Sequence, residues 1–356
     1  MRSKRYHPQT CSGQICCRKG AVVTEEAALL LEWYKRCGRT LPWRVRGDAH
    51  PDPYAVWVSE IMLQQTTVKS VIPYFERWMK RFPDLETLAA ASVDEVLLLW
   101  QGLGYYSRAK KMHLCARLLA ERYGGVFPSE REELLKLPGI GPYTASSLCA
   151  FGFNKSETVV DGNVLRVISR YYGIEKEVDT RSIFPLAAAL TPENCGADYA
   201  SAIMDLGALV CTPKTPRCAG CPWEAGCVAG KKGLTGTIPL LKKLQKKKKK
   251  GAVFVFTAPE EKFFIRKRPG KGLLSGLWEL PWSEEGEFPC EAQWEKLPHK
   301  VRHVFTHIDL ELEFYRTSCL PPEELLAQGI FIPREEISRY PFSTLMKKVL
   351  KKLQGS

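Results

Sequence analysis

A cluster of cysteines near residue 220 has the composition of a metal site. The pattern C-x6-C-x2-C-x5-C is formed by Cys211, Cys218, Cys221 and Cys227. Thiolates gathered in one short loop can hold either Zn²⁺ or an iron–sulfur cluster. Zinc ribbons usually carry a C-x2-C pair on each of two hairpins, whereas this chain has a single C-x2-C inside one compact loop. The spacing therefore favours a [4Fe–4S] cluster. Lys214 and Arg217 within the loop would place positive charge beside a phosphate.

A pair of carboxyl groups lies in contrasting surroundings. Glu60 belongs to the largely apolar stretch VSEIMLQQ, and apolar surroundings raise the pKa of a carboxyl group, which suits a general acid. Asp161 precedes Gly162 and Asn163 at the start of an expected helix, where backbone N–H groups favour the ionised form. One protonated and one ionised carboxyl can together cleave a glycosidic bond. The alternatives are a surface helix residue for Glu60 and a plain N-cap for Asp161.

A glycine-rich turn lies between the two carboxyl groups in the sequence. The stretch LPGIGPYTASSL predicts helices over 130–137 and 142–152, joined by a tight turn at Gly139 and Gly141. A hairpin of this kind turns backbone N–H groups outward, which suits a phosphate of a nucleic-acid backbone. Glycine leaves room for the turn and for close approach of the backbone. A structural turn between packed helices would give the same pattern.

The elements that must position these groups divide the chain into two domains. Strand signals are nearly absent before residue 250, whereas AVFVFTA, KFFIRKR and HVFTHIDLELEFYRT have the composition of strands. We expect a mainly α domain followed by a smaller α+β domain. The predicted segments are a disordered extension at 1–23, a helical domain at 24–230, a Lys-rich linker at 231–250 and an α+β domain at 251–353.

Composition restricts the class of protein. The net charge is +13, and nine of these charges are lysines of residues 231–250, so the folded domains are only weakly basic. A lysine run of this kind is either a solvated linker or an aid to binding a polyanion. No apolar run approaches the length that spans a membrane. The basic N-terminus lacks the apolar segment of a secretory signal, so we expect a cytosolic protein without disulfides.

Together these features resemble the helix–hairpin–helix DNA glycosylases of the endonuclease III superfamily. Within that group the chain is most similar to the adenine DNA glycosylases, the MutY family. The supporting motifs are LPWR, WVSEIMLQQTTV, GLGYYSRA, LPGIGPYTA and VDGNVLRV. The resemblance is dense over 24–230 and looser over 251–353. It implies a [4Fe–4S] cluster on the cysteine loop and a helix–hairpin–helix fold.

The resemblance also implies roles for individual residues. Glu60 would protonate adenine and then activate water. Asp161 would stabilise the cationic sugar, either electrostatically or through a short-lived covalent bond, with Asn163 supporting the pair. Arg44, in LPWR, matches a base-pocket arginine, although it could equally be a surface residue. Tyr143 stands where strand-nicking relatives carry a lysine, and because tyrosine cannot form a Schiff base, we expect a monofunctional enzyme.

An enzyme that acts on a base inside a duplex must first extrude that base. The segment Leu63, Gln64 and Gln65 follows Glu60, and by resemblance Gln65 enters the base stack beside the extruded nucleotide. Tyr105, in GLGYYSR, would wedge next to the opposite base. Ordinary helix and loop packing is the alternative for these residues.

The second domain resembles the Nudix-like C-terminal domain of the same family. Phe305, Thr306 and His307 match the Phe-Ser-His tip that recognises the oxidised guanine, with Thr in place of Ser. The sequence after WELP lacks the pattern REUxEExGU of Nudix pyrophosphatases, so hydrolysis of nucleoside triphosphates is not expected. The segment between Pro281 and Leu297 is short for this fold, and we expect its helix to be trimmed.

The predicted function is removal of adenine mispaired with 8-oxoguanine, or with guanine, from double-stranded DNA. We expect a monomer in the bacterial cytosol, associated with the nucleoid. The alternatives are a glycosylase for thymine opposite guanine, a non-catalytic damage-binding protein and a zinc-bearing scaffold. Glu60 and Asp161 argue against a mere binder, and visible absorption would distinguish an iron–sulfur cluster from zinc.

Overall fold

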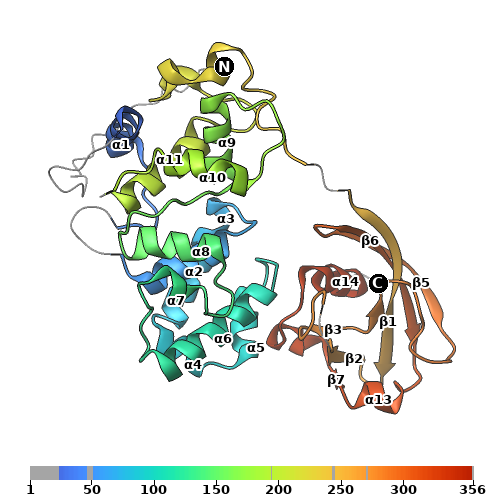
Figure 1. Ribbon diagram of the computed structural model, residues 1–356. Helices are drawn as coiled ribbons and strands as arrows, with labels where there is room; N and C mark the ends of the chain where they lie inside the picture. Colours follow the sequence, from blue (N-terminus) through green and yellow to red (C-terminus); the bar gives the residue numbers. More distant parts are fainter. Residues whose placement is uncertain (1–23, 46–50, 194, 243–244, 270–271, 355–356) are drawn as a thin grey trace, which may run out of the picture. The chain divides into compact units, whose positions relative to one another are not determined.

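The computed structural model describes residues 24–45, 51–193, 195–242, 245–269 and 272–354, so the expected extension at 1–23 lies outside the described residues. The chain divides into two compact units, each with its own core (Figure 1). The first unit comprises Met1–Thr87 and Cys115–Lys242, and the second comprises Leu88–Leu114 and Lys243–Ser356. The second unit therefore takes in a segment that the sequence assigned to the helical domain.

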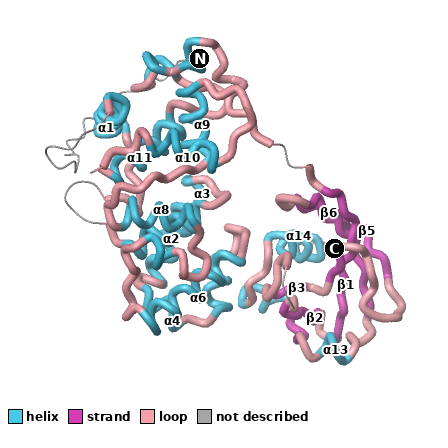
Figure 2. Tube along the Cα trace, viewed as in Figure 1, coloured by secondary structure: helices cyan, strands magenta, loops and turns pink. Residues whose placement is uncertain are grey.

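The first unit is built from helices (Figure 2). Several of them begin at a polar side chain that accepts a hydrogen bond from the first turn, as Thr24 does from the backbone N–H of Ala27 at 3.2 Å. Its helices are α1 (Glu25–Cys37), α2 (Pro53–Leu63), α3 (Val68–Arg81), α7 (Arg131–Leu134), α8 (Pro142–Ser147), α9 (Gly162–Tyr172), α10 (Thr180–Ala188), α11 (Gly196–Leu209) and α12 (Val228–Lys231). The helices α4 (Leu85–Ala90) and α6 (Ser107–Arg122) continue across the unit boundary in the sequence, and α5 (Val93–Trp100) belongs to the second unit.

Close packing of α9 against α11 forms the centre of the first unit. A Cβ atom at Gly207 of α11 would lie only 2.7 Å from the Cβ of Asn163 on α9, so glycine permits this approach. Leu30 of α1, Ile168 of α9 and Leu206 of α11 are fully buried in the same apolar cluster. These helices form the packed core that positions the polar residues of the unit.

A mixed β-sheet forms the second unit, in the order β3-β2-β1-β6-β5, with β4 paired to β1 and β7 paired to β2. The neighbours β1 and β6 run parallel, and the other pairs are antiparallel. The strands are β1 (Lys247–Ala258), β2 (Lys262–Lys267), β3 (Trp278–Glu279), β4 (Trp282–Ser283), β5 (Glu295–Val304), β6 (Ile308–Thr317) and β7 (Gly329–Ile332). The predicted strand pair at HVFTHIDLELEFYRT is thus the β5–β6 hairpin.

Apolar side chains of the sheet pack against the C-terminal helix. Val253 of β1 and Phe314 of β6 share a buried cluster with Leu345 and Val349 of α14 (Thr344–Gln354). The short helix α13 (Glu323–Leu326) precedes β7. No helix forms in the described stretch between Pro281 and Leu297, as the short sequence there predicts. Among the described residues, no helix has the length and apolarity needed to cross a membrane.

The Lys-rich segment differs from the predicted linker at both ends. The carbonyl of Ile238 accepts a hydrogen bond from Arg170 Nε at 2.9 Å, so residues beyond 231 still pack on the helical unit. At the other end, Lys247–Lys250 are already part of β1 and pair with β6. Strand pairing uses main-chain groups only, so a lysine-rich sequence can form a strand whose side chains project into water. Composition alone could not reveal this pairing.

Candidate active site and cysteine loop

Glu60 is a buried acid on α2. Its side chain lies in the interior with only 6% of its surface exposed, and Tyr143 Oη donates a hydrogen bond to Glu60 Oε2 at 2.8 Å. Burial raises the pKa of Glu60 to about 7, and the negative charge of Asp161 adds to this, whereas the Tyr143 hydrogen bond and the Arg44 charge lower it. Glu60 is therefore not the surface residue that a helix position alone would allow.

Asp161 is fixed at the N-terminus of α9. Its Oδ1 accepts hydrogen bonds from the backbone N–H groups of Asn163 and Val164, both at 2.8 Å. Its Oδ2 accepts a further bond from Asn163 Nδ2 at 2.8 Å. Asp161 is thus an N-cap, as its sequence position suggests, and the charge that it carries also acts on Glu60. The cap and the influence on Glu60 coexist in one side chain.

Tyr143 joins the helix α8 to this pair. Burial raises the pKa of Tyr143 well above its usual value, and the negative charges of Glu60 and Asp161 raise it further. The phenol therefore stays protonated and serves as a hydrogen-bond donor to Glu60. The helices α2, α8 and α9 together bring the predicted catalytic set into one neighbourhood, which consists of Glu60, Tyr143, Asp161 and Asn163.

The glycine-rich turn precedes α8 directly. Gly139 has φ +82°, a left-handed conformation that favours glycine. Gly141 has φ −96°, and a Cβ built there meets no atom within 4 Å. The protein itself therefore requires glycine at 139 but not at 141, where the space is left open. The expected second helix is short: α8 ends at Ser147 and the chain continues as a π-helical turn, η1 (Leu148–Gly152).

Arg44 is held by a carboxylate that sequence reasoning missed. Asp205 on α11 is fully buried and lies 2.9 Å and 3.0 Å from Arg44 Nη1 through its two oxygens. It also accepts bonds from the backbone N and Nε of Arg39 at 2.7 Å and 2.8 Å. Arg44 is therefore anchored in the unit rather than free at the surface. The sequence does indicate this residue, because Asp205 is an acid inside the apolar stretch ASAIMDLGALV. Glu60 lies in an apolar stretch in the same way.

The predicted stack-inserting residues lie at the C-terminal end of α2. Leu63 is its last residue, Gln64 is its C-cap, and Gln64 Nε2 donates to Thr144 Oγ1 at 3.4 Å. Gln65 is exposed and has φ +64°. The helix thus ends in a strained, outward-facing turn that begins a few residues after Glu60.

The remaining predicted residues belong to the second unit. Tyr105 has φ +47° and 47% of its surface exposed, and its Oη lies 2.5 Å from Thr306 Oγ1. Phe305, Thr306 and His307 form the turn between β5 and β6. Within the second unit, the structure therefore brings Tyr105 and Thr306 together.

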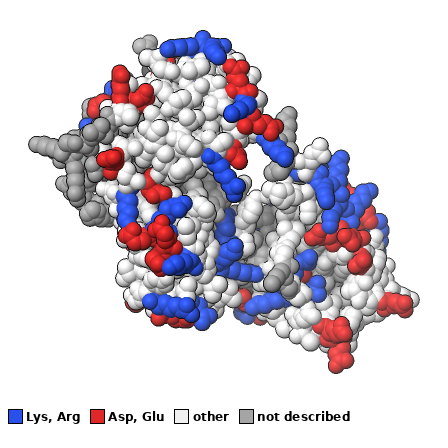
Figure 3. Space-filling view, viewed as in Figure 1, with Lys and Arg blue, Asp and Glu red and all other residues white. Residues whose placement is uncertain are grey.

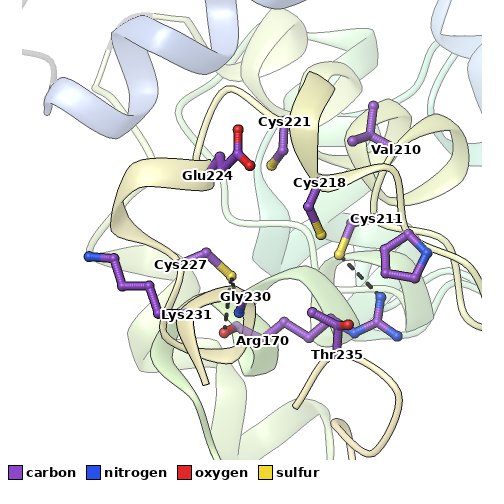
Figure 4. A pocket seen from close by; sticks show the side chains of 11 residues that line it. Arg170, Val210, Cys211, Cys218, Cys221, Glu224, Cys227, Gly230, Lys231 and Thr235 are labelled. Carbon is purple, nitrogen blue, oxygen red and sulfur yellow. Dashed lines mark hydrogen bonds between the residues drawn. The ribbon is translucent and has the colours of Figure 1, made fainter. Parts of the chain in front are cut away.

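The cysteine loop encloses a cavity of about 230 Å³ (Figure 4). Its sulfur atoms face this common space, with Arg170 beneath them. Arg170 is almost fully buried, and its Nη1 donates to Cys211 Sγ at 3.4 Å and to the carbonyl of Thr212 at 2.7 Å. The backbone N–H of Gly230 donates to Cys227 Sγ at 3.4 Å. The loop is therefore tied to α9 and supplied with donors to sulfur.

The donor set of the cysteine loop fits a metal centre bound by thiolates. Among the described residues, no group of three or more His, Cys, Asp or Glu side chains is arranged to hold one metal ion. The thiols of Cys211, Cys218, Cys221 and Cys227 nevertheless line one cavity. Thiolates gathered around one space can hold either Zn²⁺ or the larger body of an iron–sulfur cluster. The donors to sulfur are of the kind that tunes such a cluster.

A chain of hydrogen bonds connects the cysteine loop to Asp161. Arg166 of α9 donates from Nε to the carbonyl of Cys211 at 2.8 Å and from Nη2 to Asn163 Oδ1 at 2.9 Å. Since Asn163 Nδ2 donates to Asp161, Arg166 fixes the orientation of the amide that supports the carboxylate. Sequence reasoning missed this residue, although a basic residue inside the apolar helix NVLRVIS is an available signal.

Comparison with known proteins defines the class. Residues 58–190 match the HhH-GPD superfamily of base excision DNA repair proteins, and residues 252–352 match the NUDIX domain. A thermostable thymine-DNA glycosylase is 27% identical in sequence, with a TM-score of 0.53 over 58% of this chain and 97% of that chain. Endonuclease III in a non-covalent DNA complex shares the fold, with a TM-score of 0.51 at 20% identity over 60% of this chain and 99% of that chain. The predicted fold class is confirmed: a helix–hairpin–helix repair domain joined to a Nudix domain.

Relatives along most of the chain define the family. The adenine DNA glycosylase of Buchnera aphidicola subsp. Schizaphis graminum is 35% identical over 299 residues, which cover 79% of this chain and 85% of the relative. The human adenine DNA glycosylase is 32% identical over 412 residues, which cover 95% of this chain and 76% of the relative. This chain belongs to the adenine DNA glycosylases, a family of base excision repair enzymes, as the sequence motifs predict.

Proposed function

We propose that this enzyme removes adenine mispaired with 8-oxoguanine, or with guanine, from double-stranded DNA by hydrolysis of the N-glycosyl bond. The observation that carries the proposal is the buried Glu60, hydrogen-bonded by Tyr143 and influenced by the charge of Asp161. Such a pair of carboxyl groups in unlike environments suits the cleavage of a glycosidic bond. Membership of the adenine DNA glycosylases supports adenine as the base removed.

Glu60 acts first as a general acid. With its pKa raised to about 7 by burial, a large share of the side chain is protonated near neutral pH. As the bond between the sugar C1′ and adenine breaks, its electron pair leaves with the base and Glu60 gives its proton to an adenine ring nitrogen. The resulting carboxylate then accepts a proton from water as the water oxygen bonds to C1′. The cycle regenerates protonated Glu60.

Asp161 stabilises the positive charge that develops on the sugar. Its carboxylate is held by the N–H groups of α9 and by Asn163, so it is in place before the reaction begins. The stabilisation is electrostatic or passes through a short-lived covalent bond to C1′. Asn163, held by Arg166, is a positioning residue for this carboxylate.

The residues around this centre bind the extruded base and the DNA. Arg44 contacts adenine, which is supported by its anchoring through Asp205 and by the effect of its charge on the pKa of Glu60. The turn at Gly139 and Gly141 binds a phosphate of the DNA backbone through its N–H groups, which the open space at Gly141 supports. Leu63, Gln64 and Gln65 enter the stack that the base has left.

Recognition of the opposite base belongs to the second unit. Tyr105 wedges beside that base, and the turn formed by Phe305, Thr306 and His307 contacts it. The short distance between Tyr105 Oη and Thr306 Oγ1 supports a shared recognition surface. The hydroxyl of Thr306 retains the hydrogen-bonding capacity of serine and adds a methyl group.

The chemistry of Tyr143 makes the enzyme monofunctional. A phenol has no amine nitrogen and cannot form a Schiff base with the sugar. The enzyme therefore releases the base and leaves the strand intact. Duplexes treated with the enzyme should break at the site only after treatment with alkali, and breaks without alkali would contradict this assignment.

A [4Fe–4S] cluster is held by Cys211, Cys218, Cys221 and Cys227, whose thiols line one cavity. Bound there, it would fix the loop that follows α11, which includes the positively charged Lys214 and Arg217. Arg170 supports the cluster by donating to Cys211 Sγ. A yellow-brown protein with visible absorption is expected, and a colourless zinc protein would contradict the assignment. We place the enzyme in the bacterial cytosol, as a monomer associated with the nucleoid.

Substrate preference is tested with a set of duplexes that differ at one pair. Adenine is placed opposite 8-oxoguanine, guanine, cytosine and thymine, and a further duplex carries thymine opposite guanine. We expect adenine release opposite 8-oxoguanine and guanine, with little release from the other duplexes. Faster release of thymine than of adenine would instead favour the function named for the thymine-DNA glycosylase that shares this fold.

A further inference from the structure

The lysine tract, residues 246–250, belongs to the β-sheet from Lys247 onward. Strand β1 begins at Lys247 and runs parallel to β6, with Lys247 opposite Ile308 and Lys250 opposite Glu311. The backbone N–H of Lys247 also donates to the carbonyl of His307 at 2.9 Å. The tract is therefore a structured strand attached to the turn that we assign to recognition of the opposite base.

This turn is fixed from both sides. The backbone N–H of Phe305 donates to the carbonyl of Ile308 at 2.7 Å, and the Phe305 ring packs edge-on against His303 at 4.6 Å. With the bond from Lys247, these contacts set the position of the turn relative to the lysine strand. A molecule that contacts the turn thus has the lysine side chains at a defined place beside it.

Among the described residues, most lysines of the tract form no close ion pair, although the charges of Lys246 and Lys248 act on Asp309. Lys249 is half-buried and pairs with Glu284 at 2.8 Å. Among the residues that the structure describes, no ion pair within 4 Å involves the other lysines of the tract, which are Lys246, Lys247, Lys248 and Lys250. Asp309, opposite Lys248 in the register, is engaged by Arg302 through a bond of 2.8 Å from Nε. Figure 3 shows Lys and Arg side chains gathered over the start of β1 and the neighbouring β6.

We propose that Lys246, Lys247, Lys248 and Lys250 bind the phosphate backbone of duplex DNA beside the β5–β6 turn. The inference rests on the proposed function, because it takes duplex DNA as the ligand of that turn. A strand rises about 3.3 Å per residue, so the tract spans about 13 Å. Phosphates of one DNA strand recur every 3.4 Å along the axis. Because successive side chains of a strand point to opposite faces, about three of the lysines can reach one DNA strand. Contacts of this kind strengthen binding without regard to the bases.

The test measures the salt dependence of binding by the full-length protein. The tract variant replaces Lys246, Lys247, Lys248 and Lys250 by Gln. Two labelled duplexes are used: one with a non-cleavable adenine analogue opposite 8-oxoguanine, and one fully matched. Loss of about three phosphate contacts should lower the slope of log K against log salt by about 2.7 on both duplexes. Affinity near physiological salt should fall about tenfold or more on both.

A control variant of the same unit removes equal charge at the opposite end of the sheet. The residues replaced by Gln are Lys262, Lys296, Arg316 and Arg334. Each of them forms an ion pair with a glutamate in the wild type. This variant should keep the wild-type slope, and so should a tract variant with Arg in place of each Lys. The thermal midpoint of each variant establishes that it is folded.

The outcomes separate this proposal from the proposed function. An unchanged slope in the tract variant, or an equal fall in the control variant, would overturn the lysine contact. A fall on the mispaired duplex alone would also overturn it, because a phosphate contact cannot distinguish the bases. A lower slope on both duplexes, in a protein whose wild type releases no adenine, would support the lysine contact and sink the catalytic proposal.

Discussion

Carboxyl groups of the first unit owe their different chemistry to their surroundings. Glu60 is buried, and burial outweighs its hydrogen bonds from Tyr143 and Ser147, so its pKa rises to about 7. Asp161 receives backbone and amide donors at a helix N-terminus. Asp205 is fully buried but faces the guanidinium groups of Arg39 and Arg44. The residue types alone would not separate an acid, an electrostatic stabiliser and an anchor.

Glu60→Gln should change stability in a pH-dependent manner. The pKa of Glu60 is raised from 4.5 to about 7 on folding, so burial of the neutral form costs nothing extra at low pH. Between about pH 4.5 and 7 the unfolded chain loses this proton while the folded protein keeps it, so the stability of wild type falls by at most about 3 kcal/mol across this range and stays lower above it. We expect the gain in thermal midpoint of Glu60→Gln over wild type to be greater near pH 8 than near pH 5. The exposed-site control Glu132→Gln should show no such trend, and a pH-independent gain for Glu60→Gln would contradict the buried-acid assignment.

Asp205→Asn should be strongly destabilising. The substitution leaves the charges of Arg39 and Arg44 without their buried partner, and breaking such a pair typically costs about 3–5 kcal/mol. The midpoint of urea unfolding measures the loss, with Glu132→Gln again as the exposed control. Stability within about 0.5 kcal/mol of wild type would show that Asp205 does not anchor these arginines.

At the scale of elements, α9 links the chemistry to the cysteine loop. Its N-terminus holds Asp161, its first turn presents Asn163, and Arg166 and Arg170 reach the main chain around Cys211. The close approach of α11 through Gly207 keeps this helix in place. A displacement of α9 would therefore alter both the carboxylate and the loop.

Gly207→Ala should disturb this arrangement. In an open helix, Gly→Ala would stabilise by about 1 kcal/mol. Here the new Cβ would lie 2.7 Å from Asn163 Cβ, and overpacking of this kind costs about 1–3 kcal/mol. We expect a lower thermal midpoint and slower adenine release. Gly236→Ala, where a Cβ meets no atom within 4 Å, is the matched control, and equal behaviour of the two variants would contradict the packing argument.

Local patterns predicted the elements but not their contacts. The cap at Asp161 and the cysteine spacing are properties of short segments, so the sequence revealed them directly. The bond between Tyr143 and Glu60 joins residues far apart in the sequence, and no periodicity indicates it. Asp205 went unnoticed because its helix has the composition of an ordinary core element. The tract Lys247–Lys250 was assigned to a linker because strand pairing depends on a neighbour, not on composition.

At the scale of the whole molecule, the two units divide the proposed tasks. The carboxyl groups, the glycine-rich turn and the cysteine loop belong to the first unit, whereas Tyr105 and the β5–β6 turn belong to the second. Under the proposed function, removal of the base and discrimination of its partner would be carried by separate compact units. The lysines at the start of β1 belong to the second unit as well.

A protein truncated after Lys242 should lose discrimination rather than chemistry. It keeps Glu60, Tyr143 and Asp161 but lacks the β5–β6 turn. We expect the ratio of adenine release opposite 8-oxoguanine to release opposite guanine to fall towards one, while release opposite guanine persists. Single-turnover rates on both duplexes measure the ratio, and an unchanged ratio would move recognition of the opposite base out of the sheet.

The most direct test of the account is detection of free adenine by mass spectrometry. A duplex with one adenine opposite 8-oxoguanine is incubated with an excess of enzyme whose visible absorption shows that the cluster is bound. The account predicts that wild type releases adenine and that Asp161→Asn releases essentially none, although it still binds the duplex. Absence of free adenine with wild type, or equal release by Asp161→Asn, would contradict the proposed catalytic pair.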